Sequence, residues 1–144
     1  MAEHINTSTL MKRLFKTKHL DAFLKSNEKY MEVPSFTELL QRRCRERGMV
    51  AEQVILHSGL DRTYGHQLFN GTRRPSRDKV LQLALGLEAG VEGAGELLRA
   101  AGRSELYPRF RRDAVLLYCL KEKITVLETQ EILDQYGLSL LGEG

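Results

Sequence analysis

The segment Asp61–Pro75, DRTYGHQLFNGTRRP, is rich in side chains that can hydrogen-bond to nucleic-acid bases. Four of them fall at spacings that place them on neighbouring strips of one helical face: Arg62, Thr63, His66 and Gln67. An arginine can donate two hydrogen bonds to guanine, and a glutamine can pair in the same way with adenine. We therefore interpret this segment as a short helix whose exposed face could contact base edges in the DNA major groove.

The residues at both ends of this segment favour a helix with defined limits, over about residues 61–70. Asp61 can accept a hydrogen bond from the free N–H groups of a first helical turn. Gly71 suits the left-handed position that commonly ends a helix. A short basic loop follows, made of Thr72, Arg73, Arg74 and Pro75. Its arginines are expected to bind backbone phosphates, which fixes the register of a protein on DNA without sequence readout.

The rest of the chain predicts helices throughout. Apolar residues recur at helical spacing, and no sustained alternation of β-branched residues indicates a strand. We expect helices over about 9–15, 19–24, 35–47, 51–57 and 61–70, from 76 onward, and over 96–101, 114–120 and 125–136. The expected fold class is therefore all-α.

Capping boxes and breaker residues set the expected helix limits. The pairs Ser35-Glu38 and Thr125-Glu128 can exchange hydrogen bonds with the first turns of their helices. Pro108 fits the start of a helix. Three glycines are expected to loosen the connection before the helix 96–101: Gly90, Gly93 and Gly95.

The composition is that of an ordinary soluble globular protein, with 42% hydrophobic and 28% charged residues. No apolar run approaches membrane-spanning length, and the first residues lack the long apolar core of a signal peptide. We therefore expect a cytoplasmic protein without membrane contact. Cys44 and Cys119 form no CxxC pair, and the histidines show no ligand spacing. We expect reduced, buried or semi-buried thiols, and neither a metal, a cofactor nor a catalytic site.

The formal net charge of +3 is distributed unevenly along the chain. Residues 36–88 carry nine Lys and Arg against six Asp and Glu, whereas the residues from Ala89 onward carry seven against nine. A basic middle and a mildly acidic C-terminal part suit a centre that binds an anion and an end that faces protein. Solvated helix surface is the alternative interpretation of the same charges.

The segment Gly48–Leu87 resembles the helix-turn-helix of the lambda-repressor-like (XRE, Cro/cI) family, whose pattern is roughly GLSQEELAxxxGVSxxxISxIExGxRxPSxxxLxxLAxxL. The chain matches this pattern without a gap at Gly48, Glu52, Val54, Gly59, Leu60, Leu68, Gly71, Arg73, Pro75, Ser76, Leu83, Ala84 and Leu87. With the helix before it, the resemblance covers residues 36 to about 87. It implies a helix-turn-helix bundle whose second helix lies in the major groove.

The resemblance also implies roles for individual residues. Those at positions that contact bases are Arg62, Thr63, His66 and Gln67, and those that approach the phosphate backbone are Asn70, Thr72, Arg73 and Arg74. The chain departs from the pattern at two places. The family's Ser-Gln at the start of the first of the two helices is Val50-Ala51 here, which removes a cap and a phosphate contact. Gly65 replaces a buried Ile or Val, and Tyr64 is expected to fill the space.

We expect three parts in the chain: a helical arm over 1–34, a helix-turn-helix domain over 35–102, and a helical extension over 103–144 for dimerisation or partner binding. The leading interpretation is a sequence-specific transcriptional regulator of bacterial or phage type that binds double-stranded DNA as a homodimer. The alternative is a protein-interaction adaptor that keeps the fold without DNA readout and binds a partner through the arm or the C-terminal helices. An enzyme has no support, and the operator, the sign of regulation and any effector stay open.

Overall fold

The structure is a computed structural model that describes residues 5–31 and 34–142. Every regular element within these two ranges is a helix, so the all-α prediction is confirmed. The chain divides into two compact units, Met1–Val33 and Pro34–Gly144. No helix in the described ranges is long and apolar enough to span a bilayer.

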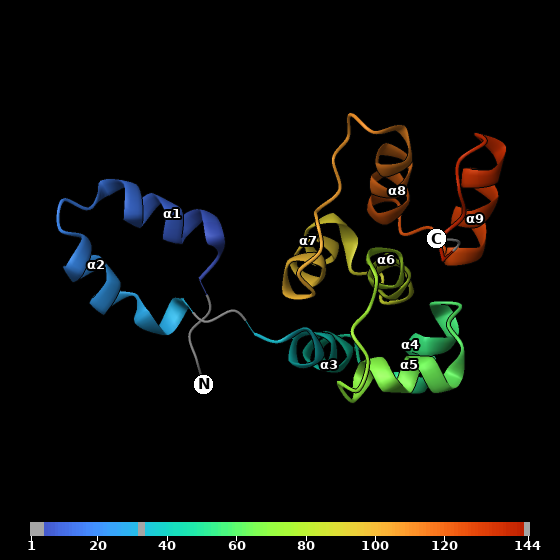
Figure 1. Cartoon of the computed structure of the whole chain (residues 1–144), viewed down its shortest axis with the longest axis horizontal. Coiled ribbons are helices and arrows are strands. Elements are labelled where there is room, and N and C mark those ends of the chain that lie inside the picture. The colour runs from blue at the N-terminus through green and yellow to red at the C-terminus, as the bar shows by residue number, and fades with distance from the viewer. Residues whose placement is uncertain (1–4, 32–33, 143–144) are drawn as a thin grey trace. The chain divides into compact units, whose positions relative to one another are not determined.

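The first unit is a helical hairpin made of α1 (Thr7–Lys16), α2 (Leu20–Ser26) and the 3-10 turn η1 (Glu28–Tyr30), as Figure 1 shows. Asn6 caps α1 by accepting a hydrogen bond from the N–H of Thr9. Asn27 closes the hairpin, because its side chain accepts from Arg13 and donates to the carbonyl of Phe23. Phe23 is buried, whereas α1 has no buried residue and exposes most of its apolar stripe.

The second unit contains α3 (Phe36–Glu46), α4 (Ala51–His57), α5 (Arg62–Phe69), α6 (Arg77–Gly86), α7 (Gly90–Ala100), α8 (Arg111–Lys121) and α9 (Val126–Gln135). α6 lies at the centre of this unit, because it packs against α4, α7, α8 and α9 (Figure 1). Every residue of α6 from Val80 to Gly86 is buried. The core continues into the C-terminal helices, where Leu116 and Leu133 are fully buried. The helices after residue 102 therefore pack on the same core as α4 and α6.

Four helices of this unit, α3, α5, α6 and α9, begin where the sequence places a capping side chain. The side chains that accept a hydrogen bond from the backbone N–H three residues later are those of Ser35, Asp61, Ser76 and Thr125. Gly71, directly after the C-cap of α5, has a φ of 82°, the left-handed conformation that this position requires. Val50 has no side-chain acceptor, so α4 keeps only the reciprocal bond from the Val50 N–H to Gln53 Oε1 at 3.1 Å.

The expectation that three glycines loosen the connection before residue 96 is wrong, because α7 runs unbroken over Gly90–Ala100. Packing explains the difference. A Cβ at Gly93 would lie 2.9 Å from Arg43 Nη1, so the missing side chain makes room for the arginine of α3. Arg43 then pairs with Glu96 at 2.7 Å, which joins α3 to α7. The tertiary contact outweighs the low helix propensity of glycine.

α8 differs from the expectation at its start and in its apolar face. It begins at Arg111, and Pro108 lies in the turn before it. The N–H of Tyr107 donates to Asp113 Oδ2 at 2.9 Å, which holds this turn against the first turn of the helix. Tyr118 is 57% exposed, so the apolar run of α8 is divided between core and surface.

The two thiols are free and buried, as predicted. Burial raises the pKa of Cys44 to about 11, and the positive charge of Arg45 opposes this only in part. Burial also raises the pKa of Cys119, against a hydrogen bond with Thr129 that lowers it. Both thiols are therefore protonated at neutral pH and pack as small apolar groups.

Candidate functional site

The segment Asp61–Pro75, whose side chains can hydrogen-bond to bases, forms α5 and the loop after it. The N–H of Tyr64 donates to Asp61 Oδ2 at 3.0 Å, which fixes the first turn of α5. Leu68 and Phe69 are buried and anchor one face of the helix in the core. The other face carries Arg62 and Thr63, which are exposed, and His66 and Gln67, which are half-buried. The structure therefore brings the four predicted base-reading residues together on the accessible part of one helix.

The close packing of α4 on α5 depends on Ile55 and Gly65. A Cβ at Gly65 would lie 2.6 Å from Ile55 Cγ2 and 2.7 Å from Ile55 Cγ1, closer than non-bonded carbon atoms approach. Ile55 thus fills the space that a larger residue at position 65 would need. The expectation that Tyr64 fills this space is wrong, because Ile55 does so and the half-buried Tyr64 lies beside Arg73 and Lys79.

Glu52, on α4, joins two of the predicted base-reading residues, although the sequence pattern did not single it out for this. Its Oε1 accepts a hydrogen bond from Arg62 Nε at 2.9 Å and contacts His66 Nε2 at 2.8 Å. Arg62 and His66 lie four residues apart on α5, so one carboxylate can reach both. The hydrogen bond with His66, followed by that from Arg62, lowers the pKa of Glu52 below its ordinary value. Glu52 is therefore an anion at neutral pH.

Arg73, in the basic loop, is held beside α5. Its Nε donates to Gln67 Oε1 at 3.0 Å, and its guanidinium carbon lies 5.8 Å from the centre of the Tyr64 ring. Lys79 Nζ also lies 5.8 Å from the centre of that ring. Two cations therefore approach one aromatic ring, at a distance where the attraction is favourable. Lys79 is a basic side chain of this surface that the sequence interpretation did not include.

The other loop residues have partners within the second unit. Asn70 Oδ1 accepts hydrogen bonds from the N–H and the hydroxyl of Thr72. Arg74 donates through Nε and Nη2 to the carbonyl of Ala101, at 3.4 and 3.2 Å. The loop borders a pocket of about 240 Å³, which is lined by Phe36, Thr37, Gly71, Arg73, Arg74, Pro75, Ala100 and Ala101. Its two arginines make this pocket electropositive.

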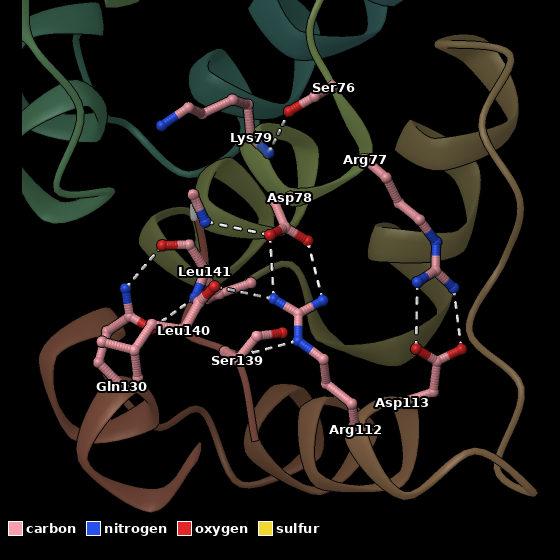
Figure 2. A network of polar contacts seen from close by, with 11 residues as sticks. Ser76, Arg77, Asp78, Lys79, Arg112, Asp113, Gln130, Ser139, Leu140 and Leu141 are labelled. Carbon is pink, nitrogen blue, oxygen red and sulfur yellow. Dashed lines mark hydrogen bonds and ion pairs between the residues drawn. The ribbon is translucent and has the colours of Figure 1, made fainter. Parts of the chain in front are cut away.

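The first turn of α6, directly after the basic loop, is joined to the first turn of α8 by two neighbouring ion pairs, Arg77 with Asp113 and Asp78 with Arg112 (Figure 2). Arg77 forms two hydrogen bonds with Asp113, and Arg112 forms two with Asp78. Asp78 also accepts from the N–H of Gly142 at 3.0 Å. Burial would raise the pKa of both carboxyls, but their hydrogen bonds outweigh it and lower both pKa values. The C-terminal segment therefore fixes the far end of the loop.

Comparisons with protein-family models, curated proteins and solved structures find no match for this chain. Within the described ranges, no group of three or more His, Cys, Asp or Glu side chains could hold a metal ion. This surface combines hydrogen-bonding groups and cations on α5 and the basic loop with one carboxylate, that of Glu52 on α4, which contacts Arg62 and His66.

Proposed function

We propose that this protein is a sequence-specific transcriptional regulator of the lambda-repressor-like helix-turn-helix type, which binds double-stranded DNA. The observation that carries the proposal is the division of α5 into a buried apolar face and an accessible face of hydrogen-bonding side chains. α5 follows α4 after a tight connection in which Gly59 has a φ of 67°. Two short packed helices joined by a turn with glycine are the helix-turn-helix plan, whose second helix enters the major groove.

The side chains divide between base contacts and backbone contacts. On the accessible face of α5, Arg62 would pair with guanine and Gln67 with adenine, while Thr63 and His66 would contact neighbouring base edges. The groups that would approach phosphates are Asn70, at the end of α5, and three residues of the basic loop, Thr72, Arg73 and Arg74. Such phosphate contacts supply affinity that falls with salt and is nearly independent of sequence.

We further propose that the regulator is a homodimer on a two-fold symmetric site, with half-sites about one helical turn apart. Exposed aromatic residues near α8 support an interface there. The rings of Tyr107 and Phe110, just before α8, are in edge-to-face contact with centres 5.6 Å apart, and Tyr118 is exposed on α8 itself. Aromatic side chains are enriched in protein interfaces. Sedimentation equilibrium of the full chain gives the mass in solution and tests this part directly.

Selection from a pool of random duplexes with the full chain tests DNA readout. The expected result is enrichment of one motif, with binding that weakens as salt rises. The proposal is contradicted if the protein shows no salt-sensitive binding to any duplex of the pool. The selected motif also gives the duplexes that the more specific experiments require.

A second candidate function, a protein-interaction adaptor, is favoured by the first unit. α1 exposes Met11, Leu14 and Phe15, the last at 76%, and its described residues include Lys and Arg but no Asp or Glu. Such a basic amphipathic helix suits a partner whose groove is apolar and acidic at its rim. If the protein is an adaptor without DNA readout, Phe15→Asp should change which proteins co-purify with the full chain. Arg62→Ala should leave that set of proteins unchanged. A regulator predicts that Arg62→Ala changes the DNA sites that are occupied.

A further inference from the structure

Glu52 places a negative charge on the surface that carries the candidate base-reading residues. Its side chain is 50% exposed and that of Arg62 is 79% exposed, so the pair is open to solvent. A carboxylate in this position repels a phosphate but accepts hydrogen bonds from the amino groups that bases display in the major groove. The neighbourhood of Glu52 therefore suits base edges and not the DNA backbone.

The hydrogen bond with Glu52 determines which part of Arg62 remains available. It uses Nε, and within the described ranges neither Nη1 nor Nη2 of Arg62 has a hydrogen-bond partner. These two nitrogens form a planar pair of donors that matches O6 and N7 of guanine. The other pair of donors that a guanidinium can offer includes Nε, and this nitrogen is already bound to Glu52. Arg62 thus presents one defined edge of its guanidinium.

His66 supports the same arrangement from one turn further along α5. Its Nε2 contacts the carboxylate oxygen that accepts from Arg62, so Glu52 is held from two sides. An exposed arginine loses rotamer freedom when it binds a base, and this loss weakens binding. A carboxylate that orients the guanidinium in the free protein reduces that loss.

We propose that Glu52 is a specificity-determining residue, which orients Arg62 so that Nη1 and Nη2 pair with one guanine of the DNA site. The inference rests on the proposed DNA-binding function, because it assigns a part of the same surface. Glu52 acts through Arg62 and is in this sense a positioning residue. Its removal should change the preference at one base pair and should leave the binding of unrelated DNA undiminished.

The chain offers a matched control for this idea. Glu88 pairs with Arg47 at 3.0 Å, and both side chains are about as exposed as Glu52. Glu88 follows α6 and its partner follows α3, so neither belongs to α5 or to the basic loop. Glu88→Ala therefore removes the same charge and the same kind of ion pair as Glu52→Ala, without touching Arg62.

The experiment measures equilibrium binding of the full-length wild type, Glu52→Ala, Glu52→Gln and Glu88→Ala to the selected duplex and to variants of it. At each position all four base pairs are compared, together with an unrelated duplex. We expect Glu52→Ala to lose about tenfold of the preference for guanine at a single position. Binding to the unrelated duplex should stay equal or become tighter, because an anion has been removed.

Glu52→Gln retains an acceptor oxygen and should recover part of the preference, which a general loss of stability would not produce. Glu88→Ala should keep the wild-type preference at every position. A Glu52→Ala protein as selective as the wild type overturns the inference alone. A wild type that selects no sequence overturns the proposed function and this inference together.

Discussion

Arg77 and Asp113 are joined by two parallel hydrogen bonds, from Nη1 to Oδ1 at 3.1 Å and from Nη2 to Oδ2 at 2.9 Å. Arg77 is the first residue of α6 and Asp113 lies in the first turn of α8, so the pair connects the end of the basic loop to the C-terminal helices. The carboxyl of Asp113 is only 6% exposed. The position of the loop thus depends on residues that lie far along the chain.

We predict that Asp113→Ala lowers the free energy of unfolding by about 3 kcal/mol, because the partly buried guanidinium of Arg77 loses its carboxylate partner and is left with the carbonyls of Ser104 and Glu105. Chemical denaturation of the full chain measures this. Glu105→Ala is the control, since Glu105 pairs with Arg99 at 2.6 Å but both side chains are about half exposed. That variant should lose at most about 1 kcal/mol. Equal losses in the two variants would show that the ion pair of Arg77 and Asp113 contributes no more to the free energy of unfolding than an exposed ion pair does.

The lowered pKa of Asp113 also predicts how the free energy of unfolding changes at acidic pH. Burial would raise its pKa, but the hydrogen bonds from Arg77 and from the Tyr107 N–H outweigh burial and lower the pKa below the ordinary 3.8. The ionised form is therefore favoured by folding, and its contribution is complete above about pH 4 and lost as the pH falls further. Denaturation at a series of pH values below about 5 should show a smaller loss of stability for Asp113→Asn than for the wild type. Parallel curves would contradict this assignment.

The contact between Ile55 and Gly65 predicts a coupled pair of substitutions. Gly65→Ala should destabilise the protein by about 1–3 kcal/mol, because the new Cβ overlaps Ile55. Ile55→Ala should also destabilise it, by about 2–5 kcal/mol, through the cavity that it leaves. The double variant should lose less than the sum of the two, since each change relieves the other.

Gly95→Ala is the control for the glycine substitution. A Cβ there would lie 3.0 Å from Glu105 Oε1, the mobile end of an exposed side chain, and alanine has the higher helix propensity. This variant should be as stable as the wild type or more stable. Additive losses at positions 55 and 65 would show that the two residues do not compete for one space.

Arg73 is predicted to contribute to affinity without contributing to sequence preference. Arg73→Ala should weaken binding to all duplexes by a similar factor and lower the slope of log affinity against log salt by about one. Arg47→Ala, which removes an exposed arginine of the second unit outside the loop, should leave that slope unchanged. A change in base preference with an unaltered salt slope would assign Arg73 to the bases instead.

The local features of the site could be predicted from the sequence, because the residues that determine them are close together in the chain. The cap at Asp61, the left-handed Gly71 and the polar face of α5 each depend on a few neighbouring positions. The same holds for the all-α class, which follows from periodicity. Whether this surface binds DNA stays a prediction.

The features that could not be predicted come from contacts between separate helices. Glu52 reaches Arg62 and His66 across ten and fourteen residues, and only the packing of α4 on α5 brings them together. One indication of this contact lies in the sequence: Arg62 and His66 are four residues apart on a helix, so a single anion can bind both. In α7, Gly93 lies inside a helix at a point where Arg43 of α3 leaves no room for a side chain. Helix propensity depends on local sequence and cannot predict this contact between two helices.

The most direct test of the DNA-binding proposal is equilibrium binding of the full chain to its selected duplex and to a scrambled duplex of equal length, over a range of salt concentrations. We predict that both affinities fall with salt, and that the selected duplex binds more tightly by a factor on the order of 10³ or more. Equal affinity for the two duplexes, or binding that does not respond to salt, would contradict the account.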